Sequence, residues 1–286
     1  MLFFEVWTLR ITACSQNLRK YECSNQTSGT RGTLCDRTVR AAFGGRIGIL
    51  IEENWVDNDG IRINFFQSKP EKAGRTPLLI CPGLSESAEE YINLMSSLQD
   101  NRCIALSFRG RGKSDSPLMG YSLEDHVSDI AAVVKQLELD DFCLMGYSRG
   151  VSYALGYAIH HHENIKGLII EEYPAQHKQM PSGWGEEYLL SPWGERMNPR
   201  AVMGIELESR QVDFQDNLAK LDCSALIIRG GNDGSLLSDD DIKCYVRCLR
   251  DVRLEVFEDA VHDIQTEFFD RFVQVINAFL RELGQK

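Results

Sequence analysis

One serine in the sequence has the neighbours that a nucleophile needs. The pentapeptide Gly146–Gly150 reads GYSRG, and it stands between the apolar runs Phe142–Met145 and Val151–Ala158. This order predicts a buried strand, a tight turn and a packed helix, the nucleophile elbow G-x-S-x-G, with Ser148 at the turn. The glycines fit, because larger side chains would collide where strand and helix cross. Alone, however, the motif is more often a serine in a turn.

Two further side chains suit chemistry at Ser148, because a serine hydroxyl needs an adjacent base to act as a nucleophile. Asp233 follows the apolar run Ala225–Ile228, and His262 follows the run Arg253–Phe257. Parallel strands present their carboxyl ends, and the groups that follow them, at one edge of a sheet. The order nucleophile, Asp233, His262 is that of a Ser-Asp-His triad. We therefore expect Ser148 to be catalytic.

The acid is the weakest member of this predicted triad. Asn232-Asp233-Gly234 is also ordinary turn chemistry, which is the alternative reading of Asp233. Glu171 and Glu172, which follow another apolar run, are the fallback acid.

Two backbone N–H groups are candidates for an oxyanion hole, which acyl transfer requires. One belongs to Arg149, directly after the nucleophile, and the other to Leu84, in the segment PGLSES after the apolar run Leu78–Cys81. Gly83 lets the backbone approach closely there. The Arg149 side chain has two possible roles, pairing with a loop carboxylate or meeting an anionic substrate, and we favour the pairing.

Predicted strands and helices alternate along the part of the chain that carries these groups, and a predicted hairpin precedes that part. Before them, Trp55–Phe66 reads as a hairpin around Asp59-Gly60, so we expect an antiparallel start. From Pro77, short apolar runs alternate with helical patterns, which predicts a mostly parallel sheet with helices on both faces. Residues 172–221 interrupt the alternation with four prolines, and we interpret them as an inserted lid.

The alternating part of the chain contains six predicted strands and five predicted helices. Strands are expected at Leu78–Cys81, Cys103–Ser107, Phe142–Met145, Leu168–Ile170, Ala225–Ile228 and Arg253–Phe257. Helices are expected at Glu86–Leu98, Leu123–Leu137, from the elbow to His162, at Asp239–Leu249 and at Phe268–Leu280.

From Arg46 to its end the chain resembles a serine α/β-hydrolase of the single-domain, lidded kind. Ser107–Pro117 reads SFRGRGKSDSP and closely matches that family's structural D-x-R-G-x-G-x-S-D-x-P loop. Gly230–Asp233 resembles its acid loop, and GYSRG its elbow. The resemblance implies that Ser148, Asp233 and His262 form the triad.

The chain departs from the family pattern at four places. Pro82 stands where the oxyanion loop usually has a histidine, and Ser107 where the Arg-Gly loop usually opens with aspartate. Val261 replaces a glycine before the histidine, and Arg149 replaces a small or apolar residue.

The inserted segment carries aromatic residues that could line a substrate pocket. Trp184, Tyr188 and Trp193 either form an apolar acyl or ring pocket or pack the lid onto the body. Among the histidines, His126 is expected to be solvated and His177 to have a surface role in the lid.

Composition limits the partners of the protein. The net charge is −11 and the pI about 5.1, which argues against nucleic acid and acidic membrane surfaces. No apolar run is long enough for a membrane span. Nine cysteines without paired C-x-x-C spacing favour free thiols in a reducing cytoplasm over zinc. We expect no metal and no cofactor, and residues 1–45 read as a poorly ordered extension before a domain from 46 to 286.

The expected function is hydrolysis of a small ester, thioester or related carbonyl substrate through an acyl-enzyme. Two alternatives use the same fold. One is a different reaction on the same triad: carbon–carbon bond hydrolysis, lyase activity or cofactor-free peroxidation. The other is a ligand-binding protein without catalysis, since fold does not fix function.

Overall fold

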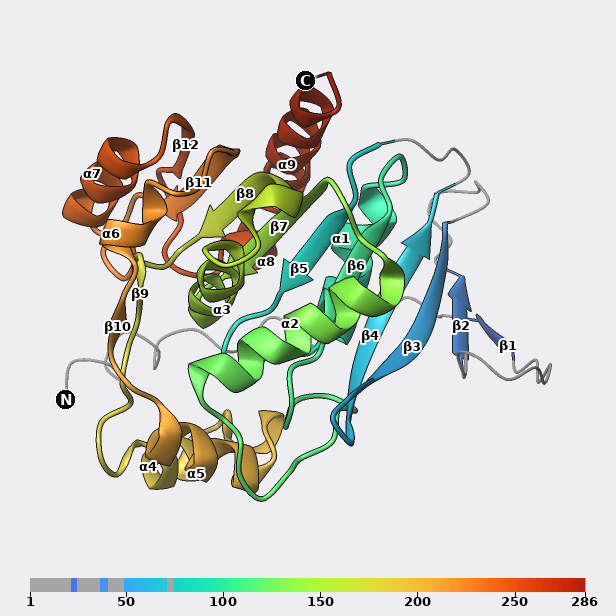
Figure 1. The fold of residues 1–286 in the computed structure, drawn as a ribbon, viewed down its shortest axis with the longest axis vertical. Coiled ribbons are helices and arrows are strands. Elements are labelled where there is room, and N and C mark those ends of the chain that lie inside the picture. Colours follow the sequence, from blue (N-terminus) through green and yellow to red (C-terminus); the bar gives the residue numbers. More distant parts are fainter. Residues whose placement is uncertain (1–21, 25–36, 41–48, 71–74, 286) are drawn as a thin grey trace.

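The computed structural model describes residues 22–24, 37–40, 49–70 and 75–285, and a ten-stranded sheet forms its centre (Figure 1). The strand order is β1-β2-β3-β4-β6-β5-β7-β8-β11-β12. The strands are β1 (Glu22–Ser24), β2 (Arg37–Arg40), β3 (Leu50–Asn58), β4 (Ile61–Lys69), β5 (Leu78–Cys81), β6 (Cys103–Leu106), β7 (Phe142–Tyr147), β8 (Ile165–Glu171), β11 (Ser224–Gly230) and β12 (Asp251–Phe257). Strands β5, β6, β7, β8, β11 and β12 pair in parallel, which confirms the mostly parallel sheet.

The antiparallel start is also confirmed. Strands β3 and β4 form a hairpin whose two-residue turn, Asp59 and Gly60, has φ angles of 51° and 86°. Such left-handed turns match the twist of the flanking strands. Strand β4 then pairs antiparallel with β6, where the parallel part begins.

Helices cover both faces of the sheet, as the alternating pattern predicts (Figure 1). Neighbouring residues of β5 point to opposite sides: Leu79 joins the core under α2 and α3, whereas Leu78 joins the core under α1 and α9. The helices are α1 (Ile92–Ser97), α2 (Leu123–Leu137), α3 (Arg149–Ala158), α7 (Asp239–Cys248), α8 (Ile264–Glu267) and α9 (Phe269–Leu283).

One predicted helix has the expected ends, and two others begin or end at different residues. Helix α2 has the predicted bounds, because Ser122 and Asp125 form a capping box at its start. The helix predicted at Glu86–Leu98 instead begins with a 3-10 turn, η1 (Ala88–Tyr91), before α1. The elbow helix α3 ends at Ala158, four residues earlier than predicted.

The insertion over residues 172–221 forms short elements away from the sheet. It contains β9 (Gln176–His177), α4 (Trp184–Leu190), η3 (Gly194–Arg196), α5 (Pro199–Glu208), β10 (Val212–Asp213) and α6 (Gln215–Leu218). Helices α4 and α5 pack together beside the loop that leads into α2 (Figure 1). The carboxylate of Glu208 accepts hydrogen bonds from the N–H groups of Gly120 and Tyr121 in that loop.

The expected extension at 1–45 lies mostly outside the described residues. Within it, β1 and β2 continue the sheet beyond β3, and the expected disorder of the rest stays a prediction. No helix among the described residues is long and apolar enough to cross a membrane. The cysteines found free are Cys81, Cys103, Cys143, Cys223, Cys244 and Cys248.

Candidate active site

Ser148 occupies a strained turn between β7 and α3. Its φ is 49° and its ψ is −132°, a conformation that costs free energy and concentrates at functional sites. A Cβ on Gly150 would lie 2.2 Å from the carbonyl oxygen of Cys81, and one on Gly146 would lie 2.5 Å from the Cα of Val151. The glycines of the pentapeptide therefore have the steric role predicted from the sequence.

His262 lies beside Ser148, as predicted. Its Nε2 is 3.1 Å from the Ser148 Oγ, and its Nδ1 is 3.2 Å from the Oε2 of Glu172. A carboxylate only accepts, so Nδ1 carries the proton and Nε2 is left to accept from the serine. This tautomer is the one that a general base needs.

Glu172 is held in place by the loop that follows β11. Its carboxylate accepts from the N–H of Gly230 (2.7 Å), the hydroxyl of Ser235 (2.7 Å) and the N–H of Leu236 (2.9 Å), besides the contact with His262. The side chain is completely buried, and the backbone φ of 58° is again in the left-handed region. Such a network fixes the carboxylate against the imidazole.

The prediction that Asp233 orients His262 is wrong. Asp233 is exposed at the tip of the loop after β11, and no hydrogen bond or ion pair joins its side chain to the described residues. The loop turns its N–H groups inward to Glu172 and its aspartate outward to solvent. The fallback acid of the sequence reading, Glu172, occupies the position instead, directly after β8.

The loop after β5 packs directly on the elbow. A Cβ on Gly83 would lie 3.1 Å from the ring of Tyr147, so glycine permits the approach. The N–H groups of Leu84 and Arg149 donate to no hydrogen-bond acceptor among the described residues. Both candidates for the oxyanion hole are thus available donors on adjoining segments.

Glu86 fixes this loop in place of the histidine that Pro82 replaces. Its Oε2 accepts from the N–H of Gly83 (2.9 Å) and from the hydroxyl of Tyr91 (2.7 Å). Burial, and then the charge of Glu90, raise the pKa of Glu86 to about 7. Sequence reasoning missed this residue, although a glutamate can accept from the N–H group three positions earlier, as it does in a capping box.

Tyr147, within the elbow itself, is a second residue that sequence reasoning missed. Its ring stacks on the imidazole of His262 with centroids 5.1 Å apart, and its hydroxyl donates to the His262 carbonyl at 3.3 Å. The strand that leads to Ser148 therefore also positions the His262 ring.

The Arg149 side chain does not pair with a loop carboxylate, contrary to the favoured expectation. Its guanidinium is buried and donates to the hydroxyl of Tyr153 (3.2 Å), Nε2 of His177 (3.0 Å) and the sulfur of Met180. His177 is buried too, so its expected surface role is wrong.

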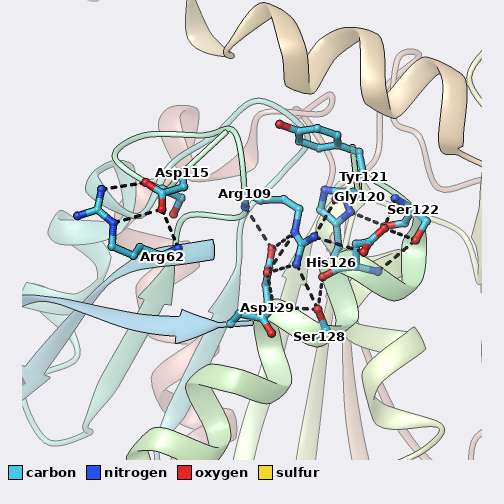
Figure 2. Close-up of polar contacts among 12 residues, drawn as sticks. Arg62, Arg109, Asp115, Gly120, Tyr121, Ser122, His126, Ser128 and Asp129 are labelled. Atoms are coloured by element: carbon cyan, nitrogen blue, oxygen red, sulfur yellow. Dashed lines mark hydrogen bonds and ion pairs between the residues drawn. The ribbon is translucent and has the colours of Figure 1, made fainter. Parts of the chain in front are cut away.

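The Arg-Gly loop is organised by Arg109, as the family resemblance implies (Figure 2). The guanidinium donates to both carboxylate oxygens of Asp129 at 2.7 to 3.2 Å and to the carbonyl of Gly120 at 2.8 Å. His126, expected to be solvated, is fully buried beside this network, because its ring stacks on Tyr153 with centroids 4.2 Å apart.

The three aromatic residues of the insertion pack in one cluster near the oxyanion loop. Tyr188 is buried, Trp184 and Trp193 pack around the same cluster, and Leu84 contacts it from the body of the protein. The Trp184 and Tyr188 rings are 5.2 Å apart. These aromatic residues therefore pack the insertion onto the body of the protein. Their contact with substrate stays a prediction.

Known proteins support the identification of the fold. A sequence family described as "alpha/beta hydrolase fold" matches residues 76–189. Solved structures agree over most of the chain: the esterase RhEst1 from Rhodococcus sp. ECU1013 has a TM-score of 0.68 at 20% identity, covering 82% of this chain and 99% of that one. The enol-lactonase from Burkholderia xenovorans LB400 has a TM-score of 0.65 at 16% identity, covering 79% and 99%.

Curated relatives match over a shorter stretch. A Bacillus subtilis protein with the provisional name 2-succinyl-6-hydroxy-2,4-cyclohexadiene-1-carboxylate synthase is 32% identical over 117 residues, 40% of this chain and 42% of that protein. The proline iminopeptidase of Heyndrickxia coagulans is 28% identical over 120 residues, 41% of each chain. The matched part thus spans about two fifths of these relatives. The ten-stranded sheet, the turn at Ser148 and the agreement with these solved structures show that the chain has the α/β-hydrolase fold.

Proposed function

We propose that the protein is a serine hydrolase that cleaves a small ester, thioester or related carbonyl compound through an acyl-enzyme. The observation that carries the proposal is the relay in which Ser148 Oγ lies 3.1 Å from His262 Nε2, and His262 Nδ1 lies 3.2 Å from Glu172. A strained serine, a correctly oriented base and a buried acid together match the requirements of nucleophilic acyl transfer.

The reaction begins with transfer of the Ser148 proton to His262 as the oxygen attacks the substrate carbonyl. The N–H groups of Leu84 and Arg149 stabilise the negative charge that develops on the carbonyl oxygen. Glu172 stabilises the imidazolium, and His262 then gives its proton to the leaving group. Water, deprotonated by His262, attacks the acyl-enzyme and releases the acid and the free serine.

The names of the relatives cover several chemistries on this fold, namely those of an esterase, an enol-lactonase, an iminopeptidase and a synthase. They support acyl and related carbonyl chemistry in general. The assignment of a small ester or thioester as substrate is our proposal. Rates of hydrolysis for a panel of esters with graded acyl length test it.

A fluorophosphonate probe tests the nucleophile. We expect the wild-type protein to be labelled at Ser148 and to hydrolyse at least one ester of the panel, and both activities to be lost in Ser148→Ala. Wild-type protein that neither reacts with the probe nor turns over any ester would overturn the proposal. The variant Ser97→Ala is a matched control, because that hydroxyl lies in α1 and donates to the carbonyl of Asn93.

A further inference from the structure

Two buried arginines, one directly after Ser148 and one bound to the loop after β5, have no carboxylate partner among the described residues. Arg149 is 3% exposed and Arg111 is 1% exposed, and neither forms an ion pair with a described side chain. They occupy the variable positions of two motifs, the elbow G-x-S-x-G and the loop R-G-x-G. The two motifs leave these positions open, so the motifs themselves do not account for the arginines.

The partners of Arg149 are neutral. The Nε2 of His177 accepts from Arg149, and its Nδ1 donates to the hydroxyl of Ser152 at 2.9 Å, so the ring is an uncharged tautomer. Burial, and then the charge of Arg149, lower the pKa of His177 to about 3. Tyr153 supplies a hydroxyl, which is also uncharged.

Arg111 also has only neutral hydrogen-bond partners, and one of its nitrogens, Nη2, has none among the described residues. Its Nε donates to the carbonyl of Leu84 (2.9 Å), and its Nη1 donates to the carbonyl of Arg109 (2.7 Å) and to Nε2 of His126 (2.8 Å). The Nδ1 of His126 donates to the carbonyl of Ser122, so this ring is neutral as well. The Nη2 of Arg111 is buried and has no hydrogen-bond partner among the described residues.

The two arginines belong to one cluster. The ring of Tyr153, whose hydroxyl accepts from Arg149, stacks on the ring of His126, which accepts from Arg111. Burial lowers the pKa of Arg111, and the nearby positive charge of Arg149 lowers it further. Two positive charges thus share one buried region.

The cluster is linked to the candidate active site at two points of the chain. Arg149 is the residue directly after the nucleophile, and Arg111 holds the carbonyl of Leu84, whose N–H faces the proposed oxyanion. Because Nε and Nη2 lie on one edge of a guanidinium, the free Nη2 of Arg111 is on the edge that faces this loop. Buried charges without a partner are costly, and a bound anion would offset that cost.

We propose that Arg149 and Arg111 form a subsite for a carboxylate group of the substrate, so that the protein acts on esters or thioesters that also carry a carboxylate. This inference rests on the proposed hydrolase function. The planar guanidinium is the side chain best suited to a carboxylate. A purely structural role predicts instead that both arginines affect charged and neutral substrates equally.

Matched ester pairs that differ only in charge test the subsite. One pair is 4-acetoxybenzoate and its methyl ester, with the charge on the leaving group; the other is monomethyl and dimethyl succinate, with the charge on the acyl group. The measured quantity is the ratio of kcat/KM for the anionic ester to that for the neutral ester. We expect the wild-type protein to prefer the anionic ester of at least one pair by about 10-fold or more.

Arginine variants show whether the preference comes from this cluster. We expect Arg149→Met and Arg111→Met to lower the ratio by roughly 10- to 100-fold, and Arg149→Lys to lower it less. Arg62→Met is the control, because that exposed arginine pairs with Asp115 and should leave the ratio unchanged (Figure 2). If a variant fails to fold, competitive inhibition of the wild type by succinate, with succinamide as the uncharged control, gives the same information.

The outcomes separate the subsite from the hydrolase function. Hydrolysis of neutral esters with labelling at Ser148, but a ratio near one for both pairs and no inhibition by succinate, would overturn the subsite and leave the function standing. If no ester reacts, a rise of the melting temperature with succinate that is lost in Arg149→Met still supports the subsite. Absence of that rise would overturn it.

Discussion

Arg109 and Arg111 are two residues apart, and their surroundings differ in charge. Arg109 faces the carboxylates of Asp129 and Asp125 in the network of Figure 2. Arg111 and Arg149 are equally buried, and their hydrogen-bond partners are uncharged carbonyls, hydroxyls, imidazole rings and a thioether. A buried cation with its own counter-ion is already compensated, and removing either partner is costly, whereas a buried cation without a counter-ion is suited to receive an anionic ligand.

The same difference holds for the acids of the two regions. Asp129 accepts from Arg109 and from Asn58. Near Ser148, burial and the charge of Glu86 raise the pKa of Glu171 well above its ordinary value, and its Oε1 has no partner among the described residues. Perturbed titratable groups gather at functional sites more than elsewhere. Changes in the Arg109 region should therefore reduce stability, and changes near Ser148 should reduce activity.

The largest expected effect is on activity. Glu172→Gln should lower kcat by about 10³- to 10⁴-fold, because an amide that donates to His262 Nδ1 leaves the proton on Nε2, which then cannot accept from Ser148. Asp233→Asn is the matched control and should change kcat by less than about 2-fold, since its side chain is exposed. Steady-state kinetics on the best ester measure both; the reverse pattern would restore Asp233 as the acid.

The next largest effect is expected on stability, in the region where Arg109 pairs with Asp129. Arg109→Met should lower the free energy of unfolding by about 3–5 kcal/mol, because it leaves the fully buried carboxylate of Asp129 without its cation. Arg62→Met removes an exposed pair with Asp115 and should lower the free energy of unfolding far less, because solvent screens that pair. Urea unfolding distinguishes the two, and equal losses would contradict the contrast between buried and exposed pairs.

A smaller change in stability is expected for Arg149, the buried arginine that has no counter-ion. Arg149→Met removes a buried charge that has no counter-ion, so the free energy of unfolding should change by no more than about 1 kcal/mol. The same urea titration measures it. A loss as large as that of Arg109→Met would mean that Arg149 is structural.

The pH dependence of stability should show a further modest effect, which comes from Glu86. Since the pKa of Glu86 rises from 4.5 to about 7 on folding, the folded state holds the extra proton, and stability falls as pH rises through this window. Glu86→Gln should remove about 1–2 kcal/mol of that fall, allowing for partial exposure to solvent. Melting temperatures of both proteins at pH 4.5 and 7.5 measure the difference; parallel curves would contradict it.

Much of the fold was predictable because the signals are local. The capping box fixes the start of α2, Asp59-Gly60 fixes the first hairpin, and the glycines of the elbow fix the crossing of β7 and α3. Each depends on residues only a few positions apart. Ser148 and His262 were predictable for a related reason, since each lies in the short segment that follows a strand-like run.

The acid and the buried histidines were not predictable from local patterns. Asp233 and Glu172 both follow strands, and only the inward N–H groups of Gly230 and Leu236 decide which carboxylate is enclosed. His177 appears polar and exposed in the sequence, yet it contacts Arg149 across 28 positions. Such choices depend on tertiary contacts, which a single sequence does not display.

The acyl-enzyme is the most direct test of the proposed chemistry. Intact-protein mass spectrometry after mixing with p-nitrophenyl acetate should show one acetyl adduct, which peptide mapping places on Ser148. The adduct should be absent in Ser148→Ala and in His262→Ala, whose circular dichroism should match the wild type. Hydrolysis without an adduct on Ser148, or an unchanged adduct in His262→Ala, would contradict the relay of Ser148, His262 and Glu172.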